Sequence, residues 1–340
     1  MSGHLPLVQA LLSPEAYPQP PRKIDLMQTQ MSFIFLTGEH VYKIKKPVNL
    51  GYLDYTTLEK RKHFCQQEVI LNRRLCPDVY LSVMTVTDFN GKYSINGKGN
   101  IVEYAVKMLQ LPQDRMMDNL ICKKRLSPDM IDRVAQKLAE FHHSAATNQE
   151  IAQYGDISFL KINTEENFSQ AKKYIDLSIT SKCYNDIIAY TRGFIQTSAP
   201  LFHERTERGR IRDCHGDLHA AHVCFTDGIQ IFDCIEFNDR FRYCDVASEI
   251  AFLAMDLDYH ERRDLSQRFV EAYVEASGDR GVGELLNFYK CYRAYVRGKV
   301  ESFKYDDAHI TLSEKDEALS KAKRYFQLAE SYISQDAVNR

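Results

Sequence analysis

The densest run of residues that could carry out chemistry is R-D-C-H-G-D-L-H-A-A-H-V-C-F-T-D-G-I-Q-I-F-D-C-I-E-F, at positions 212–237. Within it, Asp227-Gly228 stands between two short apolar runs and predicts a β-hairpin. A two-residue turn would place His222 opposite Asp233, about 5 Å apart, with Asp217 in the loop that enters the same end. These side chains could share one metal ion or one phosphate-bound ion. The alternative is a hairpin end that carries solvated charges.

A second feature lies in the first half of the chain, where a helix is predicted from about residue 55 to residue 76. Glu68 falls inside the apolar stripe of this helix, which is marked by Phe64, Leu71 and Leu75. A carboxylate on a buried face is costly unless a cation meets it. The preceding strand V-Y-K-I-K offers Lys43 and Lys45 on one face. The sequence therefore predicts a buried lysine–glutamate pair.

A strand lysine paired with a helix glutamate, followed by an H-x-D loop and a strand that ends in Asp, resembles the phosphoryl-transfer arrangement of eukaryotic-type kinases. The sequence resembles the aminoglycoside phosphotransferase family within the protein-kinase-like superfamily. The matching stretches run in order from about residue 24 to residue 260 and are H-V-Y-K-I-K-K-P, E-V-I-L-N-R-R-L, V-E-Y-A-V-K-M, C-H-G-D-L-H-A-A-H-V and I-F-D-C-I-E-F-N-D. The most specific of them contains H-G-D-L-H.

The resemblance implies a catalytic role for Asp217, which would accept the proton of the substrate hydroxyl or position that hydroxyl. Asp233 would bind Mg²⁺. Lys43 would hold the α- and β-phosphates of ATP, and Glu68 would orient it. Lys45 remains an alternative to Lys43 as the phosphate-binding lysine.

Two further parts of a nucleotide site follow from the same resemblance. The loop that covers the nucleotide would be Q-T-Q-M-S-F, in which Thr29 and Ser32 offer hydroxyl groups in place of the usual glycines. The strand from residue 102 to Met108 would end at the hinge that receives adenine.

His222 departs from the family pattern, which has Asn as a metal ligand at this position. Imidazole suits Mn²⁺ or Zn²⁺ better than Mg²⁺, so Mn²⁺ is a possible metal.

The predicted elements change in character along the chain. Strand patterns dominate residues 24–46 and 79–108, and helical patterns dominate after Pro112, with Ser127-Pro128 as a helix start. With the resemblance, this order predicts an α+β, bilobal, protein-kinase-like fold. We expect a small, mainly antiparallel β N-lobe that binds nucleotide over residues 1–110. A larger, mainly helical C-lobe for catalysis and substrate binding would cover residues 111–340.

Composition limits the classes of partner. The 340 residues carry 44 Lys plus Arg and 46 Asp plus Glu, a formal charge of −2. A near-neutral chain has no general attraction to nucleic acid, and no uncharged apolar run approaches the roughly 20 residues of a membrane span. Nine cysteines without a C-x-x-C spacing suit a reducing compartment. We expect a cytoplasmic protein without nucleic-acid or membrane partners.

These observations predict a phosphotransferase that moves the γ-phosphoryl group of ATP to a hydroxyl of a small-molecule acceptor, with Mg²⁺ or Mn²⁺. One alternative is a nucleotide-binding, pseudokinase-like module with little turnover, which His222 makes credible. Another is a metallohydrolase that would use His215, Asp217, His219 and His222. The identity of the acceptor, the choice of ATP over GTP and the oligomeric state stay open.

Overall fold

The computed structural model describes residues 5–307 and 310–339, which divide into two compact units. The first unit comprises the chain up to Leu120 together with Ala221–Asp239, and the second comprises Ile121–Ala220 and the chain from Arg240 on. The segment 221–239 thus packs with the N-terminal residues, whereas the predicted domain ranges 1–110 and 111–340 place it with the C-terminal ones. Those ranges stay a prediction.

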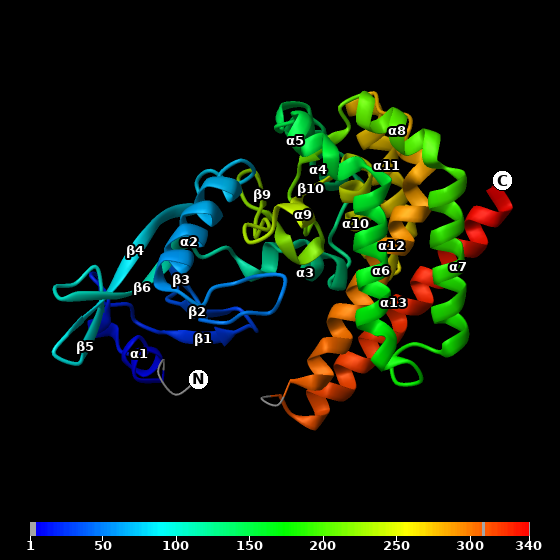
Figure 1. Ribbon diagram of the computed structural model, residues 1–340. Coiled ribbons are helices and arrows are strands. Elements are labelled where there is room, and N and C mark those ends of the chain that lie inside the picture. The colour runs from blue at the N-terminus through cyan, green and yellow to red at the C-terminus, as the bar shows by residue number, and fades with distance from the viewer. Residues whose placement is uncertain (1–4, 308–309, 340) are drawn as a thin grey trace. The chain divides into compact units, whose positions relative to one another are not determined.

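The first unit is built on an antiparallel sheet, in which six strands of the described chain follow the order β1-β2-β3-β6-β4-β5. Helix α2 (Leu58–Asn72) covers one face, and the short helix α1 (Leu5–Ala10) lies toward the other (Figure 1). The strands are β1 (Asp25–Gln28), β2 (Ser32–Leu36), β3 (His40–Lys45), β4 (Tyr80–Phe89), β5 (Lys92–Ile95) and β6 (Asn100–Leu109).

Strand β3 shows why this sheet has two different faces. Tyr42 and Ile44 belong to the apolar cluster that includes α1, whereas Val41 belongs to the cluster beneath α2. Side chains alternate across a strand, so Lys43 and Lys45 project toward the α2 face together with Val41. The predicted sharing of one face by Lys43 and Lys45 is confirmed by the contacts of both lysines with Glu68 on α2.

An Asn-Gly turn closes the hairpin between β4 and β5. Asn90 and Gly91 both adopt positive φ values, 53° and 83°, and join β4 to β5. This is the backbone that an Asn-Gly turn supplies at low cost. Helix α2 begins after Thr57. The side chain of Thr57 accepts a hydrogen bond from the backbone N–H of Lys60, three residues later, and so caps the N-terminus of the helix.

The predicted hairpin after residue 220 is present, but its predicted register is wrong. Strands β8 (Val223–Phe225) and β9 (Ile229–Ile231) pair so that Val223 faces Ile231. The connecting loop therefore has three residues, closed by a hydrogen bond from Thr226 N to Gly228 O at 2.9 Å. His222 consequently lies opposite Phe232, whose backbone N–H donates to the His222 carbonyl, and Asp233 lies one residue beyond.

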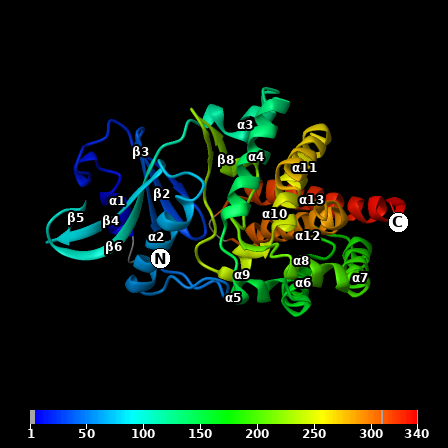
Figure 2. The ribbon, with the colours of Figure 1, turned by 90° about the horizontal axis from the view of Figure 1, so that it is seen from above.

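The second unit is mainly helical, and its long helices α10, α12 and α13 pack on one another (Figure 2). Helix α10 buries every residue from Val246 to Leu257, and the Asp245 carboxylate caps its N-terminus through Ala247 N. The helices are α4 (Pro128–Ser144), α5 (Gln149–Ala152), α6 (Ile157–Ala171), α7 (Ser181–Thr197), α8 (Ala199–Glu207), α10 (Val246–Tyr259), α11 (Arg263–Ser277), α12 (Val282–Phe303) and α13 (Leu312–Asn339).

Shorter elements complete the path of the chain. The helices α3 (Met117–Cys122) and α9 (Asp239–Arg242) lie where the chain passes from one unit to the other. Strands β7 (Ile211–Asp213) and β10 (Tyr243–Asp245) form an antiparallel pair within the second unit. A β-rich first unit and a helical second unit confirm the predicted α+β fold class.

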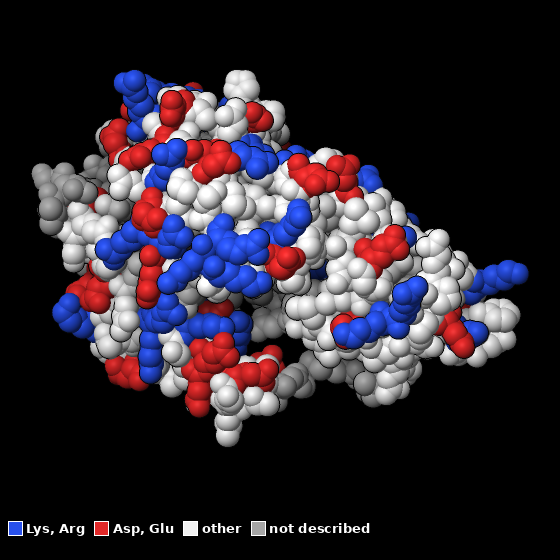
Figure 3. Space-filling model, turned by 180° about the vertical axis from the view of Figure 1, so that it is seen from behind, with Lys and Arg blue, Asp and Glu red and all other residues white. Residues whose placement is uncertain are grey.

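The surface and the thiols agree with the composition. Figure 3 shows both basic and acidic side chains on one face of the molecule, with several basic side chains gathered in a band. Each of the nine cysteines is a free thiol. Within residues 5–307 and 310–339, no helix combines the length and the apolar character that crossing a membrane requires.

Candidate active site

The centre of the first unit is a buried ion network around Glu68. The carboxylate of Glu68 is fully buried, as the position of Glu68 in the helix stripe predicts. Its Oε1 lies 2.9 Å from Lys43 Nζ, and Lys43 Nζ lies 2.7 Å from Asp233 Oδ1. The structure thus brings together three of the predicted site residues from β3, α2 and the segment after β9.

Lys45 extends this network from the other oxygen of Glu68. Its ammonium lies 2.6 Å from Glu68 Oε2 and also contacts Glu236 Oε1. The Tyr55 hydroxyl donates to the same oxygen of Glu236 at 2.6 Å. Each lysine therefore contacts one oxygen of Glu68. Each also forms an ion pair with one acidic residue of the segment 233–236, Lys43 with Asp233 and Lys45 with Glu236.

Mutual attraction keeps these groups charged in spite of their burial. Burial opposes charge on Lys43, but the carboxylates of Asp233 and Glu68 outweigh it and raise the pKa of Lys43 well above its usual value. Burial likewise opposes charge on Lys45, whose pKa Glu236 and Glu68 raise. For Glu68, burial acts against ionisation, and the two ammonium groups still lower its pKa. Lys43, Lys45 and Glu68 therefore stay charged at neutral pH.

Asp233 is held by its backbone as well as by Lys43. It has a left-handed φ of 63°, and its N–H donates to the Tyr80 hydroxyl at 3.2 Å. The next residue, Cys234, donates its N–H to Asn72 Oδ1 of α2 at 2.9 Å. The side chain of Asp233 is 41% exposed, and its Oδ2 lies 3.6 Å from His222 Nε2. The two predicted metal ligands are thus neighbours, although the predicted register is wrong.

The other residues predicted to contact the nucleotide lie in the β1–β2 turn and on strands β2 and β6. Thr29 is exposed in the β1–β2 turn, where its hydroxyl accepts hydrogen bonds from Met31 N and Ser32 N. Ser32 begins β2 and is only 2% exposed. Met108 lies on β6 and packs in the apolar cluster beneath α2. The roles proposed for these three residues stay predictions.

Asp217 belongs to the second unit, in the loop between β7 and the hairpin. Its side chain is 34% exposed, and its Oδ2 lies 3.6 Å from His219 Nε2. Its backbone N–H donates to His215 Nδ1 at 3.3 Å. His215 and His219 are both buried, which agrees with a structural role for each in shaping the loop.

Helix α10 anchors the backbone of this loop through Glu249. The buried Glu249 carboxylate accepts hydrogen bonds from His215 N at 2.6 Å and from Gly216 N at 2.9 Å. Its other oxygen lies 2.7 Å from His142 Nε2. Arg293 of α12 donates to the Gly216 carbonyl at 3.2 Å. Gly216, the residue just before Asp217, is therefore held at both its N–H and its C=O.

This anchor makes the stability of the protein depend on pH. Burial opposes ionisation of Glu249, but the bonds from His142 and the Gly216 amide lower its pKa from 4.5 to about 2. The ionised carboxylate therefore stabilises the folded state above pH 4.5, and this contribution is lost as the pH falls from 4.5 toward 2. We expect a pH-dependent part of about 3 kcal/mol.

The measurement is the free energy of unfolding by urea between pH 7 and pH 3.5, for the wild type and Glu249→Gln. The difference between the two should shrink as the pH falls, because the variant lacks the titrating group. Glu275→Gln, which changes an exposed carboxylate on α11, is the control. A difference that stays constant over this range would contradict the role of Glu249.

Sequence reasoning missed Glu236 and Glu249. Glu249 had a detectable signal, because it is a carboxylate within the apolar run V-A-S-E-I-A-F-L-A-M of α10. Glu236 had no such signal in the sequence except that it lies three residues after Asp233. Its partners Lys45 and Tyr55 lie 191 and 181 positions earlier in the chain.

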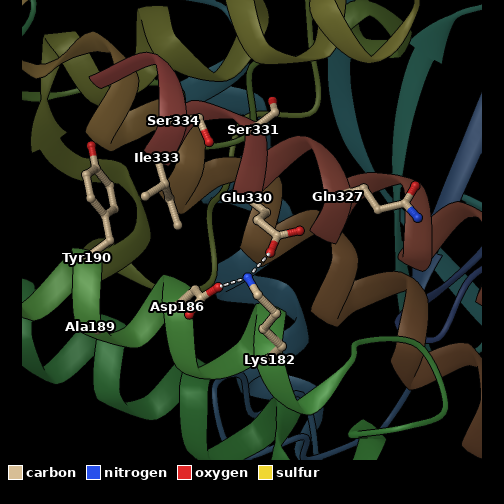
Figure 4. Close-up of a pocket in the computed structure, with 9 residues that line it drawn as sticks. All are labelled: Lys182, Asp186, Ala189, Tyr190, Gln327, Glu330, Ser331, Ile333 and Ser334. Atoms are coloured by element: carbon tan, nitrogen blue, oxygen red, sulfur yellow. Dashed lines mark hydrogen bonds and ion pairs between the residues drawn. The ribbon is translucent and has the colours of Figure 1, made fainter. Parts of the chain in front are cut away.

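A separate depression of about 590 Å³ lies on the second unit, between side chains of α7 and α13 (Figure 4). Lys182 is directed there toward Asp186 and toward Glu330, which is 3.6 Å away. These side chains are 78%, 42% and 37% exposed, so water screens their charges. We place no catalytic function in this depression.

Comparison with curated proteins gives relatives of similar sequence, and no protein-family model matches the chain. The uncharacterized proteins Rv2004c of Mycobacterium tuberculosis and Mb2027c of Mycobacterium bovis are each 30% identical to it over 316 residues, which is 93% of this chain. The chain spans 61% of the length of these relatives.

Comparison with solved structures identifies the fold. A protein of Ralstonia eutropha assigned as an aminoglycoside phosphotransferase matches with a TM-score of 0.56, at 12% identity and 98% coverage of both chains. A choline/ethanolamine kinase family protein of Mesorhizobium loti matches with a TM-score of 0.48, at 10% identity and 92% coverage of both chains. The first likeness confirms at the level of fold the resemblance that the sequence motifs indicate.

Proposed function

Because the chain has a protein-kinase-like fold, we propose that it is a phosphotransferase that moves the γ-phosphoryl group of ATP to a hydroxyl of a small-molecule acceptor. The observation that carries this proposal is the contact of Lys43 with both Glu68 and Asp233, at 2.9 Å and 2.7 Å. A strand lysine, a helix glutamate and an aspartate near a metal site are the parts that position phosphates in this chemistry.

The donor set of the first unit fits a divalent cation. Asp233 offers a carboxylate that is 41% exposed, and His222 lies beside it. Oxygen ligands suit Mg²⁺, and the imidazole adds a ligand that Mn²⁺ accepts more readily. When bound, the cation would neutralise charge on the phosphates of ATP.

The residues of the chain then have separate tasks in the proposed reaction. Lys43 binds phosphate oxygens with an ammonium that stays charged, and Glu68 keeps this ammonium in place. Asp217 accepts the proton of the acceptor hydroxyl, or orients that hydroxyl for attack on the γ-phosphorus. The bond from that phosphorus to the bridging oxygen breaks, and ADP leaves with that oxygen. Positioning and charge neutralisation supply most of the rate.

One observation favours a second candidate function. An imidazole stands where the family pattern has an amide, and it lies 3.6 Å from the metal-binding aspartate. A module that binds nucleotide with little turnover would not need an amide in place of this imidazole as a metal ligand.

The metallohydrolase alternative stays a prediction, and stoichiometric zinc in the purified protein would support it. The cytoplasmic location, which nine free thiols suit, and the absence of nucleic-acid and membrane partners also stay part of the proposal.

The test measures transfer of phosphate from γ-labelled ATP to a panel of sugars, amino alcohols and aminoglycosides, in Mg²⁺ and in Mn²⁺. We expect turnover by the wild type, with a higher rate in Mn²⁺ than in Mg²⁺. His222→Asn should keep or improve the Mg²⁺-supported rate, because an amide oxygen is the better ligand for Mg²⁺. Nucleotide binding without turnover in either metal would favour the second candidate.

A further inference from the structure

Two lysines on one strand are tied to two acidic residues on one segment. Lys43 pairs with Asp233 and Lys45 pairs with Glu236, and Glu68 stands between the lysines with one oxygen on each. Lys43 and Lys45 are two residues apart on β3, whereas Asp233 and Glu236 are three apart. The contacts thus form a continuous row from Asp233 through Lys43, Glu68 and Lys45 to Glu236.

The two ends of this row differ in exposure. The side chain of Asp233 is 41% exposed and that of Lys43 is 14% exposed, so both can meet a ligand. Lys45 is 1% exposed and Glu236 is 6% exposed. The Tyr55 ring covers the Lys45 ammonium at 4.9 Å, and the Tyr55 hydroxyl bonds to Glu236. Lys45 is therefore enclosed by protein groups, which makes Lys43 the lysine that reaches phosphate.

We propose that Lys45 and Glu236 are positioning residues for the proposed reaction, and that they hold Glu68 and Asp233 in the geometry that binds the metal–nucleotide complex. Lys45 fixes one oxygen of Glu68 and so directs the other oxygen at Lys43. Glu236 fixes the far end of the segment that begins at Asp233. This inference rests on the proposed function and adds two residues that act through others.

The charge of the row supports this assignment. Three carboxylates face two ammonium groups, which leaves one negative charge in excess. Removal of the Glu236 charge would leave the lysines matched by Glu68 and Asp233 alone. Lys45 would then draw Glu68 more strongly, and Lys43 would depend more on Asp233. The carboxylate that is to bind the metal would thus be neutralised by a lysine.

The test measures binding of Mn²⁺ by electron paramagnetic resonance, in the presence of a non-hydrolysable ATP analogue. Glu236→Gln should weaken Mn²⁺ binding by about 10- to 100-fold, the usual cost of losing a group that supports a metal ligand. Glu236→Asp keeps the charge and should restore most of the affinity. The control is Asp25→Asn, which removes an exposed carboxylate that pairs with Lys23 at 2.6 Å in the same unit.

A milder variant covers the case in which Glu236→Gln does not fold. Tyr55→Phe removes only the hydroxyl that bonds to Glu236 and should weaken Mn²⁺ binding by about 2- to 10-fold, the net worth of a typical hydrogen bond. Equal Mn²⁺ affinity in the wild type and the folded variants at positions 55 and 236 would overturn the inference and leave the proposed function standing. A wild-type protein that binds no Mn²⁺ with the analogue would overturn the proposed function and the inference with it.

Discussion

Replacement of Asp217 by Asn is expected to lower the rate of phosphoryl transfer by about 10²–10⁴-fold, the usual contribution of a positioned general base. The amide keeps the size of the side chain but cannot accept a proton from the acceptor hydroxyl. The loop should keep its shape, because Glu249 and Arg293 hold it through the backbone of residues 215 and 216. Neither of these contacts involves the side chain of Asp217. The measurement is single-turnover transfer from γ-labelled ATP at saturating Mn²⁺.

The matched control is Asp227→Asn, which removes an exposed carboxylate from the loop between β8 and β9. Binding of ATP to Asp217→Asn, measured by calorimetry, should stay within about twofold of the wild type, because the lost group acts on the acceptor rather than on the nucleotide. A transfer rate equal to that of the wild type would show that Asp217 is not the catalytic residue.

Replacement of Lys43 by Met is expected to lower kcat/KM for ATP by about 10²–10³-fold, comparable to the loss of one preorganised electrostatic contact. Met fills similar space but brings no charge to the phosphates. The variant also removes the cation between Glu68 and Asp233, so these two carboxylates repel each other more strongly. The effect should appear both in ATP affinity and in kcat.

Lys46→Met is the control for this substitution. Lys46 follows Lys45 directly, and its ammonium donates to the Thr29 carbonyl at 2.6 Å. We expect this variant to keep most of the wild-type kcat/KM. If instead Lys46→Met lost activity and Lys43→Met kept it, the phosphate-binding lysine would be misassigned.

The parts of the site that could be predicted from sequence are those that local periodicity determines. The position of Glu68 within an apolar stripe predicts its burial and its need for a cation, and both are confirmed. The alternation of β3 likewise predicts that Lys43 and Lys45 share the face that meets α2. These inferences need only the 3.6-residue and two-residue periods of helix and strand.

The parts that escaped prediction depend on one extra loop residue or on distant pairing. The Asp227-Gly228 signal indicates a hairpin but does not specify whether Thr226 joins the loop, and the bond from Thr226 N to Gly228 O decides it. The support that Glu236 and Glu249 give to the site comes from partners more than 30 positions away in the chain. Single-sequence patterns carry no such information.

The placement of both lysines on alternate residues of β3 has a consequence for how this protein can vary. A deletion of one residue between the end of β2 at Leu36 and Lys43 would exchange the faces of the strand. Tyr42 and Ile44 would then be directed at Glu68, and two ammonium groups would enter the apolar layer shared with α1. We therefore expect length variation in natural homologues to collect in the turns that flank this strand, and the strand itself to keep a fixed length.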